Sequence, residues 1–188
     1  TLVDLGQLQF QVNDLVSATE SLSRARMIYE ALQTRSPVPS ITQGLAVSAL
    51  MLGRCYLAKG EFAPAREQIS RSVQLFAELV EQYQVIDFVH RLAIARRQLA
   101  DIEVAEGQLE TAEELLDASL EELAQLIDLV EVDHTYRSDR ASLLARKGEI
   151  LTKLDRPDEA LACWQEAVEQ WEQVLQREPF AEKQFLLA

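Results

Sequence analysis

The chain has 188 residues, 48% of them hydrophobic, which is enough to bury an extended core. Its 18 Lys and Arg against 31 Asp and Glu give a net charge of −13, which disfavours contact with phosphate backbones and argues against a nucleic-acid partner. No apolar run approaches the roughly 18 residues of a membrane span and no signal-peptide pattern opens the chain, so we expect no membrane partner. The two cysteines, Cys55 and Cys163, lack CxxC spacing, which predicts no disulfide framework and suits a reducing cytoplasm.

One pattern is repeated four times along the chain. Three kinds of position recur every 47 or 48 residues: an alanine, a small residue and a large apolar residue. They are Ala18, Ala65, Ala112 and Ala160; Gly6, Gly53, Ala100 and Gly148; and Leu22, Ile69, Leu116 and Trp164. A fixed period of this size is typical of a solenoid of stacked units, none of which buries its apolar face alone. We therefore expect one continuous domain over residues 1–188, with repeats at about 1–37, 38–84, 85–131 and 132–179.

The pattern continues to both ends of the chain. Ala188 stands in phase with Ala46, Ala93 and Ala141, so a fifth repeat is expected to begin within residues 180–188. Because apolar-periodic segments reach the first and the last residue, we expect the chain to be a fragment of a longer protein.

Each repeat is predicted to be a helical hairpin. In the third repeat, apolar residues at three- and four-residue spacing stop before Gly107 and resume at Leu109. The turn inside each hairpin is expected at a pair of residues whose types tolerate turn or left-handed geometry; the pairs are Asn13-Asp14, Gly60-Glu61, Gly107-Gln108 and Asp155-Arg156. Pro64 and Pro157 are expected in the first turn of a second helix, and the links between repeats at Pro37, Gln84, Glu131 and Pro179. The small residue of the first helix is expected to face the alanine of the second and let the two backbones approach closely.

These residues resemble the tetratricopeptide repeat family. The second repeat carries the family's motif as Leu52-Gly53, Tyr56, Gly60, Ala65, Ile69 and Ser72. Two features depart from it: the period is 47 to 48 rather than about 34 residues, and Lys147 and Ala100 replace the expected Leu and Gly. The added length is similar to that of long-helix bacterial repeats in signalling and regulatory proteins. The resemblance implies an all-α solenoid of antiparallel helical hairpins in a right-handed superhelix, with four full repeats and the start of a fifth.

The resemblance also implies a binding surface, because the family usually binds peptides or helices on the concave face lined by the first helices. Carried over to this sequence, the groove comprises Phe10, Leu50, Arg54, Leu57, Ile94, Arg97, Asp101, Val104, Glu149 and Lys153, with Gln7, Val47 and Thr152 beside them. Aliphatic residues flank Arg54 and Arg97, so the groove could seat an apolar side chain and pair an acidic group. The Lys and Asn pattern by which some members bind a C-terminal carboxylate is missing. The same face could instead pack on a neighbouring domain of the parent protein.

The sequence contains no catalytic constellation. It has no nucleophile elbow and no glycine-rich phosphate loop, and His90 and His134 have no second His or Cys at ligand spacing. We therefore expect a protein that is not an enzyme and binds no cofactor or metal. Cys55 and Cys163 are interpreted as small core residues. Trp164 and Trp171 are also interpreted as core residues because their columns are mostly apolar, with a ligand-stacking platform as the alternative.

A long acidic stretch bears on the choice of partner. Twelve Asp or Glu and no Lys or Arg lie between Gln98 and Tyr136, which predicts a solvated outer face or, alternatively, a dock for a basic segment.

The leading hypothesis is a non-catalytic scaffold that binds a peptide or protein segment in the concave groove, within a cytoplasmic bacterial signalling or regulatory protein. One alternative is self-association into a homo-oligomer, since an open array end exposes apolar surface. Another is a regulatory domain that controls an enzyme elsewhere in the same polypeptide.

Overall fold

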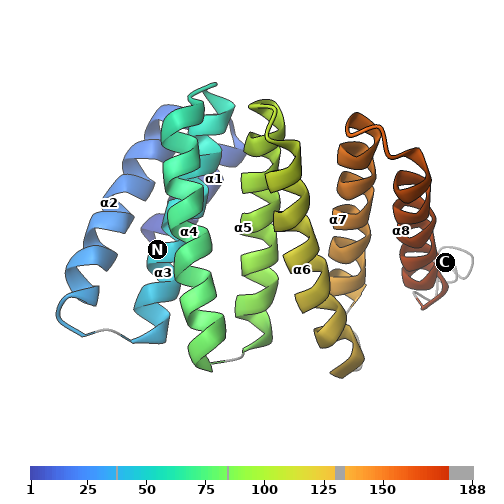
Figure 1. Cartoon of the computed structure of the whole chain (residues 1–188). Helices are drawn as coiled ribbons and strands as arrows, with labels where there is room; N and C mark the ends of the chain where they lie inside the picture. Colours follow the sequence, from blue (N-terminus) through green and yellow to red (C-terminus); the bar gives the residue numbers. More distant parts are fainter. Residues whose placement is uncertain (37, 84, 130–133, 178–188) are drawn as a thin grey trace, which may run out of the picture. The chain divides into compact units, whose positions relative to one another are not determined.

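The computed structural model describes residues 1–36, 38–83, 85–129 and 134–177 (Figure 1). Over these residues it contains helices and no strand, which confirms the expected all-α class. First and second helices alternate as α1 (Leu2–Gln11), α2 (Leu15–Gln33), α3 (Pro39–Ala58), α4 (Phe62–Tyr83), α5 (Ile86–Ala105), α6 (Leu109–Leu129), α7 (His134–Lys153) and α8 (Pro157–Arg177). The predicted links at Pro37, Gln84, Glu131 and Pro179 and the expected start of a fifth repeat at 180–188 lie outside the described residues.

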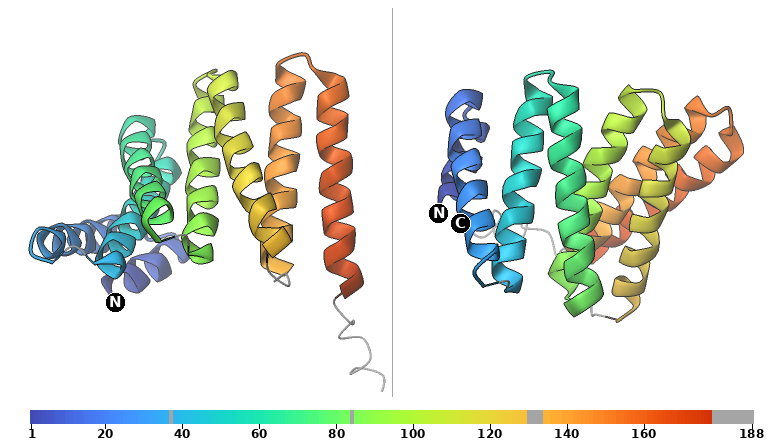
Figure 2. Two further views of the ribbon diagram at one scale, coloured as in Figure 1. Left: turned by 60° about the horizontal axis from the view of Figure 1, so that its bottom comes forward. Right: turned by 60° about the vertical axis from the view of Figure 1, so that its left-hand side comes forward.

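Each hairpin turns on a residue with left-handed backbone geometry. The φ angles are 63° at Asn13, 77° at Gly60, 80° at Gly107 and 59° at Asp155, which confirms all four predicted turns. In each turn the next residue donates its N–H to the carbonyl five residues earlier, at 2.8–3.0 Å; these pairs are Asp14 to Gln9, Glu61 to Tyr56, Gln108 to Glu103 and Arg156 to Leu151. This is the Schellman arrangement, which satisfies carbonyls that a helix end otherwise leaves without a partner. Figure 2 shows the resulting antiparallel pairs, α7–α8 in its left view and α3–α4 in its right view.

The chain divides into two compact units, Thr1–Leu115 and Leu116–Ala188. In the first unit, α1, α2 and α3 share a core built around Ala18, Leu22 and Leu52. A second core in the same unit joins α3, α4 and α5 through the buried side chains Leu45, Ile69, Phe76, Leu92 and Ile102. In the second unit, Ala141 and Leu144 of α7 pack with Ala167 of α8 and Leu120 of α6. Each unit therefore has an apolar interior of its own.

The repeat columns mark the packed interior of the hairpins. Ala18, Ala65, Ala112 and Ala160 are each 0% exposed, so their predicted equivalence is confirmed. The small column is buried as well, but its nearest neighbour differs from the expected one. A Cβ atom added to Gly6, Gly53 or Gly148 would lie 2.4–2.5 Å from Leu22, Ile69 or Trp164, whereas Ala65 approaches Gly53 only through its carbonyl oxygen at 3.2 Å. The small column therefore makes room chiefly for the large apolar column of the second helix.

The two tryptophans are not core residues, and that interpretation was wrong. Trp164 is 39% exposed and Trp171 is 38% exposed, although Ile69 and Phe76, at the same positions in α4, are fully buried. The difference is one of neighbours, because α5 packs on α4. No described helix follows α8, so the corresponding face of α8 carries no cover among the described residues.

Helix α3 departs from the expectation that no segment approaches the composition of a membrane span. By length and composition alone, Pro39–Ala58 is long and apolar enough to cross a membrane, with a mean hydropathy of 1.2. Half of this apolar segment is buried inside the protein, however, and α3 contributes Leu45 and Leu52 to the two cores of the first unit. A central packed helix meets the same criteria as a membrane span, so the composition of α3 is explained by its place between α2 and α4.

Candidate protein-binding site

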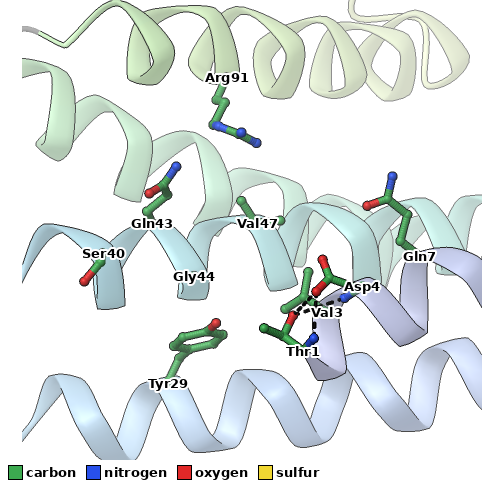
Figure 3. Close-up of a pocket in the computed structure, with 10 residues that line it drawn as sticks. All are labelled: Thr1, Val3, Asp4, Gln7, Tyr29, Ser40, Gln43, Gly44, Val47 and Arg91. Atoms are coloured by element: carbon green, nitrogen blue, oxygen red, sulfur yellow. Dashed lines mark hydrogen bonds and ion pairs between the residues drawn. The ribbon is translucent and has the colours of Figure 1, made fainter.

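The first helices of the first unit line a pocket of about 330 Å³. Its walls come from three first helices and one second helix, and Figure 3 shows how the lining residues are arranged on these helices. The lining residues are Thr1, Val3, Asp4 and Gln7 of or beside α1, Tyr29 of α2, Ser40, Gln43, Gly44 and Val47 of α3, and Arg91 of α5. The pocket therefore lies on the face that the family resemblance assigns to ligand binding.

One wall of the pocket depends on a glycine inside α3. A Cβ atom at Gly44 would lie 2.4 Å from both Cε1 and Cζ of Tyr29, so no larger residue fits while the ring stays in place. The missing side chain lets the tyrosine ring lie against the α3 backbone. Figure 3 shows the Tyr29 hydroxyl at the pocket. The pair thus supplies a flat aromatic surface with a polar end, a combination that is frequent at protein interfaces.

A guanidinium group is held at the opposite wall. Arg91 donates from Nε to Oδ2 of Asp87 at 2.7 Å, and Nε2 of Gln43 donates to the same oxygen at 3.1 Å. The carboxylate therefore couples α3 to α5 and orients the arginine, which Figure 3 shows reaching from α5 toward α1 and α3. The terminal amino groups of Arg91 form no hydrogen bond with another described residue. They are available as a planar pair of donors, the geometry that recognises a carboxylate.

The structure brings two residues of the predicted groove together. Cζ of Arg54 lies 5.0 Å from the centre of the Phe10 ring, so the cation stacks on an aromatic face. Its Nη1 also lies 3.6 Å from the sulfur of Met51, a weak contact. Both residues are half-buried. Arg54 is thus partly engaged within the protein, although it has no acidic partner among the described residues.

Other residues of the predicted groove have different surroundings. Leu50 is buried in the core, and Leu57 and Ile94 are half-buried against the same core, so they offer a ligand little free surface. Arg97, Asp101 and Val104 of α5 are half-buried too, and Arg97 has no hydrogen bond or ion pair with another described residue. Glu149 and Lys153 are exposed and belong to the second unit, and Arg146 pairs with Glu149 there.

Sequence reasoning missed most of the pocket, although one signal was present. Asp4, Ser40, Gln43 and Arg91 belong to no repeat column and form no motif. Tyr29 stands in the column of Phe76, Leu123 and Trp171, which predicts a core position and not a binding surface. Gly44, however, is the one glycine that stands outside both the small column and the turns. A glycine inside a helix costs about 1 kcal/mol relative to alanine, so its presence there indicates a close approach.

The described residues contain no group of three His, Cys, Asp or Glu side chains placed to hold a metal ion. Cys55 is fully buried, and burial raises the pKa of its thiol, which makes the nucleophilic thiolate less accessible. Its interpretation as a core residue is therefore confirmed. Cys163 is only half-buried, so the same interpretation does not hold for it.

The acidic stretch is only partly a solvated face. Glu106, Glu110, Glu114, Asp117 and Glu121 are exposed, as expected for the outer face. Glu103 is an exception, because its side chain is 7% exposed and accepts a hydrogen bond from Arg66 of α4 at 2.9 Å. The Arg66 guanidinium also reaches Glu106 at 2.5 Å, so this ion-pair cluster joins α4 to the end of α5.

No protein-family model matches the sequence, and no curated protein matches it. Solved structures are similar in fold. BtubC (BKLC) from P. vanneervenii matches with a TM-score of 0.70 and 15% sequence identity over 94% of this chain, which spans 64% of that protein, less than two thirds of its length. A putative kinesin light chain of Podosopora anserina with nearly identical TPR-like repeats matches with a TM-score of 0.57 and 22% identity, over 95% of this chain and 75% of that one. MamA matches with a TM-score of 0.52 and 14% identity, over 95% of this chain and 94% of that one. The chain therefore has a tetratricopeptide-like repeat fold, an α-solenoid built of helical hairpins.

Proposed function

We propose that the chain is a non-catalytic protein-interaction scaffold that binds a segment of a partner protein on the face formed by α1, α3 and α5. The observation that carries the proposal is the pocket of about 330 Å³ on that face, with Arg91 at one wall and Tyr29 at the other. The similarity to tetratricopeptide-like repeat structures supports the same role at the level of the fold. The expected setting, a cytoplasmic bacterial signalling or regulatory protein, stays a prediction.

The chemistry of the pocket indicates what kind of segment it suits. Most lining side chains are polar, and they present amide and hydroxyl groups from Gln7, Ser40 and Gln43. Such groups satisfy the backbone donors and acceptors of an extended peptide, which would otherwise lose hydrogen bonds on burial. Val3 and Val47 add a small apolar area. The pocket therefore suits an extended segment with one modest apolar side chain.

Arg91 adds a preference for an acidic residue in that segment. Its Nε is occupied by Asp87, while its terminal donors have no partner among the described residues. A carboxylate placed there gains two charge-assisted hydrogen bonds from a group that is already oriented, so little side-chain entropy is lost on binding. The residues of the predicted groove, including Arg54 and Arg97, would extend the same preference along α3 and α5.

The test uses random peptides displayed on phage and selected on the folded chain. Selected peptides are synthesised, and their affinities are measured by fluorescence anisotropy at two salt concentrations. We expect the selection to enrich Asp or Glu and the affinity to fall with salt, because the Arg91 contact is electrostatic. Ser40→Trp fills the pocket from an exposed position and should lower the affinity about tenfold or more.

Matched controls are available on α4. Ser70→Trp introduces the same bulk at an exposed position outside the pocket, and Arg71→Gln removes an exposed arginine from the same helix. We expect both to keep full affinity, whereas Arg91→Gln should weaken binding and flatten its salt dependence. Equal affinity of the Ser40→Trp and wild-type chains, or a selection that enriches no peptide at all, would rule out the pocket as the binding site.

A further inference from the structure

Helix α8 carries an exposed apolar stripe, which we call the α8 stripe. Its five members recur at three- and four-residue spacing and are all at least 38% exposed; they are Leu161, Trp164, Val168, Trp171 and Leu175. An open hollow runs along it, lined by Trp164, Gln165, Val168 and Glu169. Isolated exposed apolar residues need no explanation, but a contiguous row of large ones marks an interaction surface.

In the other second helices, the residues equivalent to the α8 stripe pack against a neighbouring helix. At the positions of Trp164 and Trp171, α4 has Ile69 and Phe76, which are buried in the core that α4 shares with α5. At the position of Trp164, α2 has Leu22, which shares a core with Leu52 of α3. In the second unit, Leu120 takes the place of Val168 and packs with Ala141 and Leu144 of α7. Each of these stripes is therefore covered by the first helix of the next repeat.

Helix α1 and its C-cap residue carry the complementary surface, which we call the α1 stripe and which consists of Leu5, Leu8 and Val12. Leu5 is 45% and Leu8 59% exposed. The residues of α3 at these two positions, Leu52 and Cys55, are buried against Ala18, Leu22 and Ala25 of α2. The exposed face of α1 is thus the face that a first helix turns toward the preceding second helix.

We propose that a second copy of this chain covers the α8 stripe with its own α1 stripe, so that copies associate head to tail. The contact continues an interface that the chain already makes inside its first unit, where a second helix packs on the next first helix at α2–α3 and α4–α5. The two stripes correspond to the two different surfaces of that interface, one from a second helix and one from a first helix. The association is therefore heterologous, and one copy can bind one neighbour through each stripe. This inference does not depend on the pocket or on the proposed function.

The charge of the chain sets the salt dependence of the association. Each copy carries a net charge of −13, so copies repel one another over a distance that salt shortens. The stripes themselves are apolar, and their burial does not weaken with salt. Self-association is therefore expected to strengthen as salt is added, whereas peptide binding at Arg91 is expected to weaken. Because salt affects them in opposite directions, self-association and peptide binding can be distinguished in one preparation.

The experiment blocks one stripe at a time in the 188-residue chain. Leu8→Glu disables the α1 stripe and Val168→Glu disables the α8 stripe; both positions are exposed, so the fold should survive, which circular dichroism checks. Ala162→Glu is the control, an exposed position of α8 outside the stripe. In sedimentation over a dilution series, we expect the wild-type and Ala162→Glu chains to associate and each blocked variant to stay monomeric. An equimolar mixture of the two blocked variants retains one intact stripe of each kind, so it is expected to form dimers and nothing larger.

Tryptophan fluorescence gives an independent readout, because the only two tryptophans of the chain lie in the α8 stripe. Their emission is expected to shift to shorter wavelength as the wild-type concentration rises, and in the mixture but not in either blocked variant alone. Three results would overturn the proposal. The first is a wild-type chain that stays monomeric, and the second is a Leu8→Glu variant that still dimerises through α8 alone. The third is a blue-shifted emission that does not depend on concentration, which would show that residues of the same chain cover the α8 stripe.

Discussion

Replacing Gly53 by alanine tests the idea that the small column makes room for the large apolar column. The new Cβ atom would lie 2.4 Å from Cγ1 and 3.0 Å from Cδ1 of Ile69. Ile69 is fully buried and branched at Cβ, so it cannot turn aside cheaply. Overpacking of this kind costs about 1–3 kcal/mol, against a gain of about 1 kcal/mol in helix propensity. We expect Gly53→Ala to destabilise the chain by a net value of up to about 2 kcal/mol.

The same substitution should have the opposite sign when Ile69 is removed. Ile69→Ala alone costs about 2–5 kcal/mol because it leaves a cavity. In that background the nearest atom to the new Cβ is the Ala65 carbonyl oxygen at 3.2 Å, so Gly53→Ala should stabilise by at most about 1 kcal/mol. Urea unfolding of all four chains, followed by circular dichroism, measures the coupling. Gly60→Ala is the control, because a Cβ there meets nothing within 4 Å and its cost comes from φ. If Gly53→Ala had the same effect with and without Ile69, the two columns would not be packing partners.

Three further predictions concern the columns, one helix cap and the groove. Ala65→Leu should destabilise by about 1–3 kcal/mol, whereas Ala63→Leu on the same helix should change stability by less than about 0.5 kcal/mol, because Ala65 is buried and Ala63 exposed; equal denaturation midpoints would contradict this. The Ser17 hydroxyl and the Ser17 backbone N–H, which donates to Oδ1 of Asp14 at 3.1 Å, lower the pKa of Asp14. The stability that Asp14 adds is therefore present at neutral pH and lost as the pH falls through this lowered pKa; Asp14→Asn, which keeps a cap, should remove that acid dependence from urea unfolding. Arg54→Glu combined with Arg97→Glu should lower the affinity for selected peptides about tenfold or more. Glu110→Lys combined with Glu121→Lys on the exposed outer face should leave that affinity unchanged, and anisotropy titrations measure both affinities.

The sequence predicts the hairpins well because local chemistry determines them. Asn13, Gly60, Gly107 and Asp155 tolerate a positive φ, and all four turns form on them. Burial is predicted less well, because it depends on what lies next to a helix and not on its own pattern. The period alone treats Trp164 as the equivalent of Ile69, yet α4 has a described helix packed on that face and α8 does not.

The candidate site was predicted only in part, for a similar reason. The face that the family resemblance indicates shares Gln7 and Val47 with the lining of the pocket. Tyr29 comes from a second helix, and it reaches the pocket only because Gly44 lets its ring approach the backbone of α3. The orientation of Arg91 depends on a carboxylate that also binds a side chain from another helix. Such contacts between helices leave no regular spacing in the sequence.

Methyl NMR of the chain with a selected peptide tests most directly whether the face of α1, α3 and α5 binds partner segments. Val3 and Val47 line the pocket, whereas Val16 of α2 and Val73 of α4 do not. Titration with the peptide is expected to shift the methyl signals of Val3 and Val47 to saturation and to leave those of Val16 and Val73 in place. Shifts at Val16 or Val73 without any at Val3 and Val47 would show that partner segments bind the second helices instead.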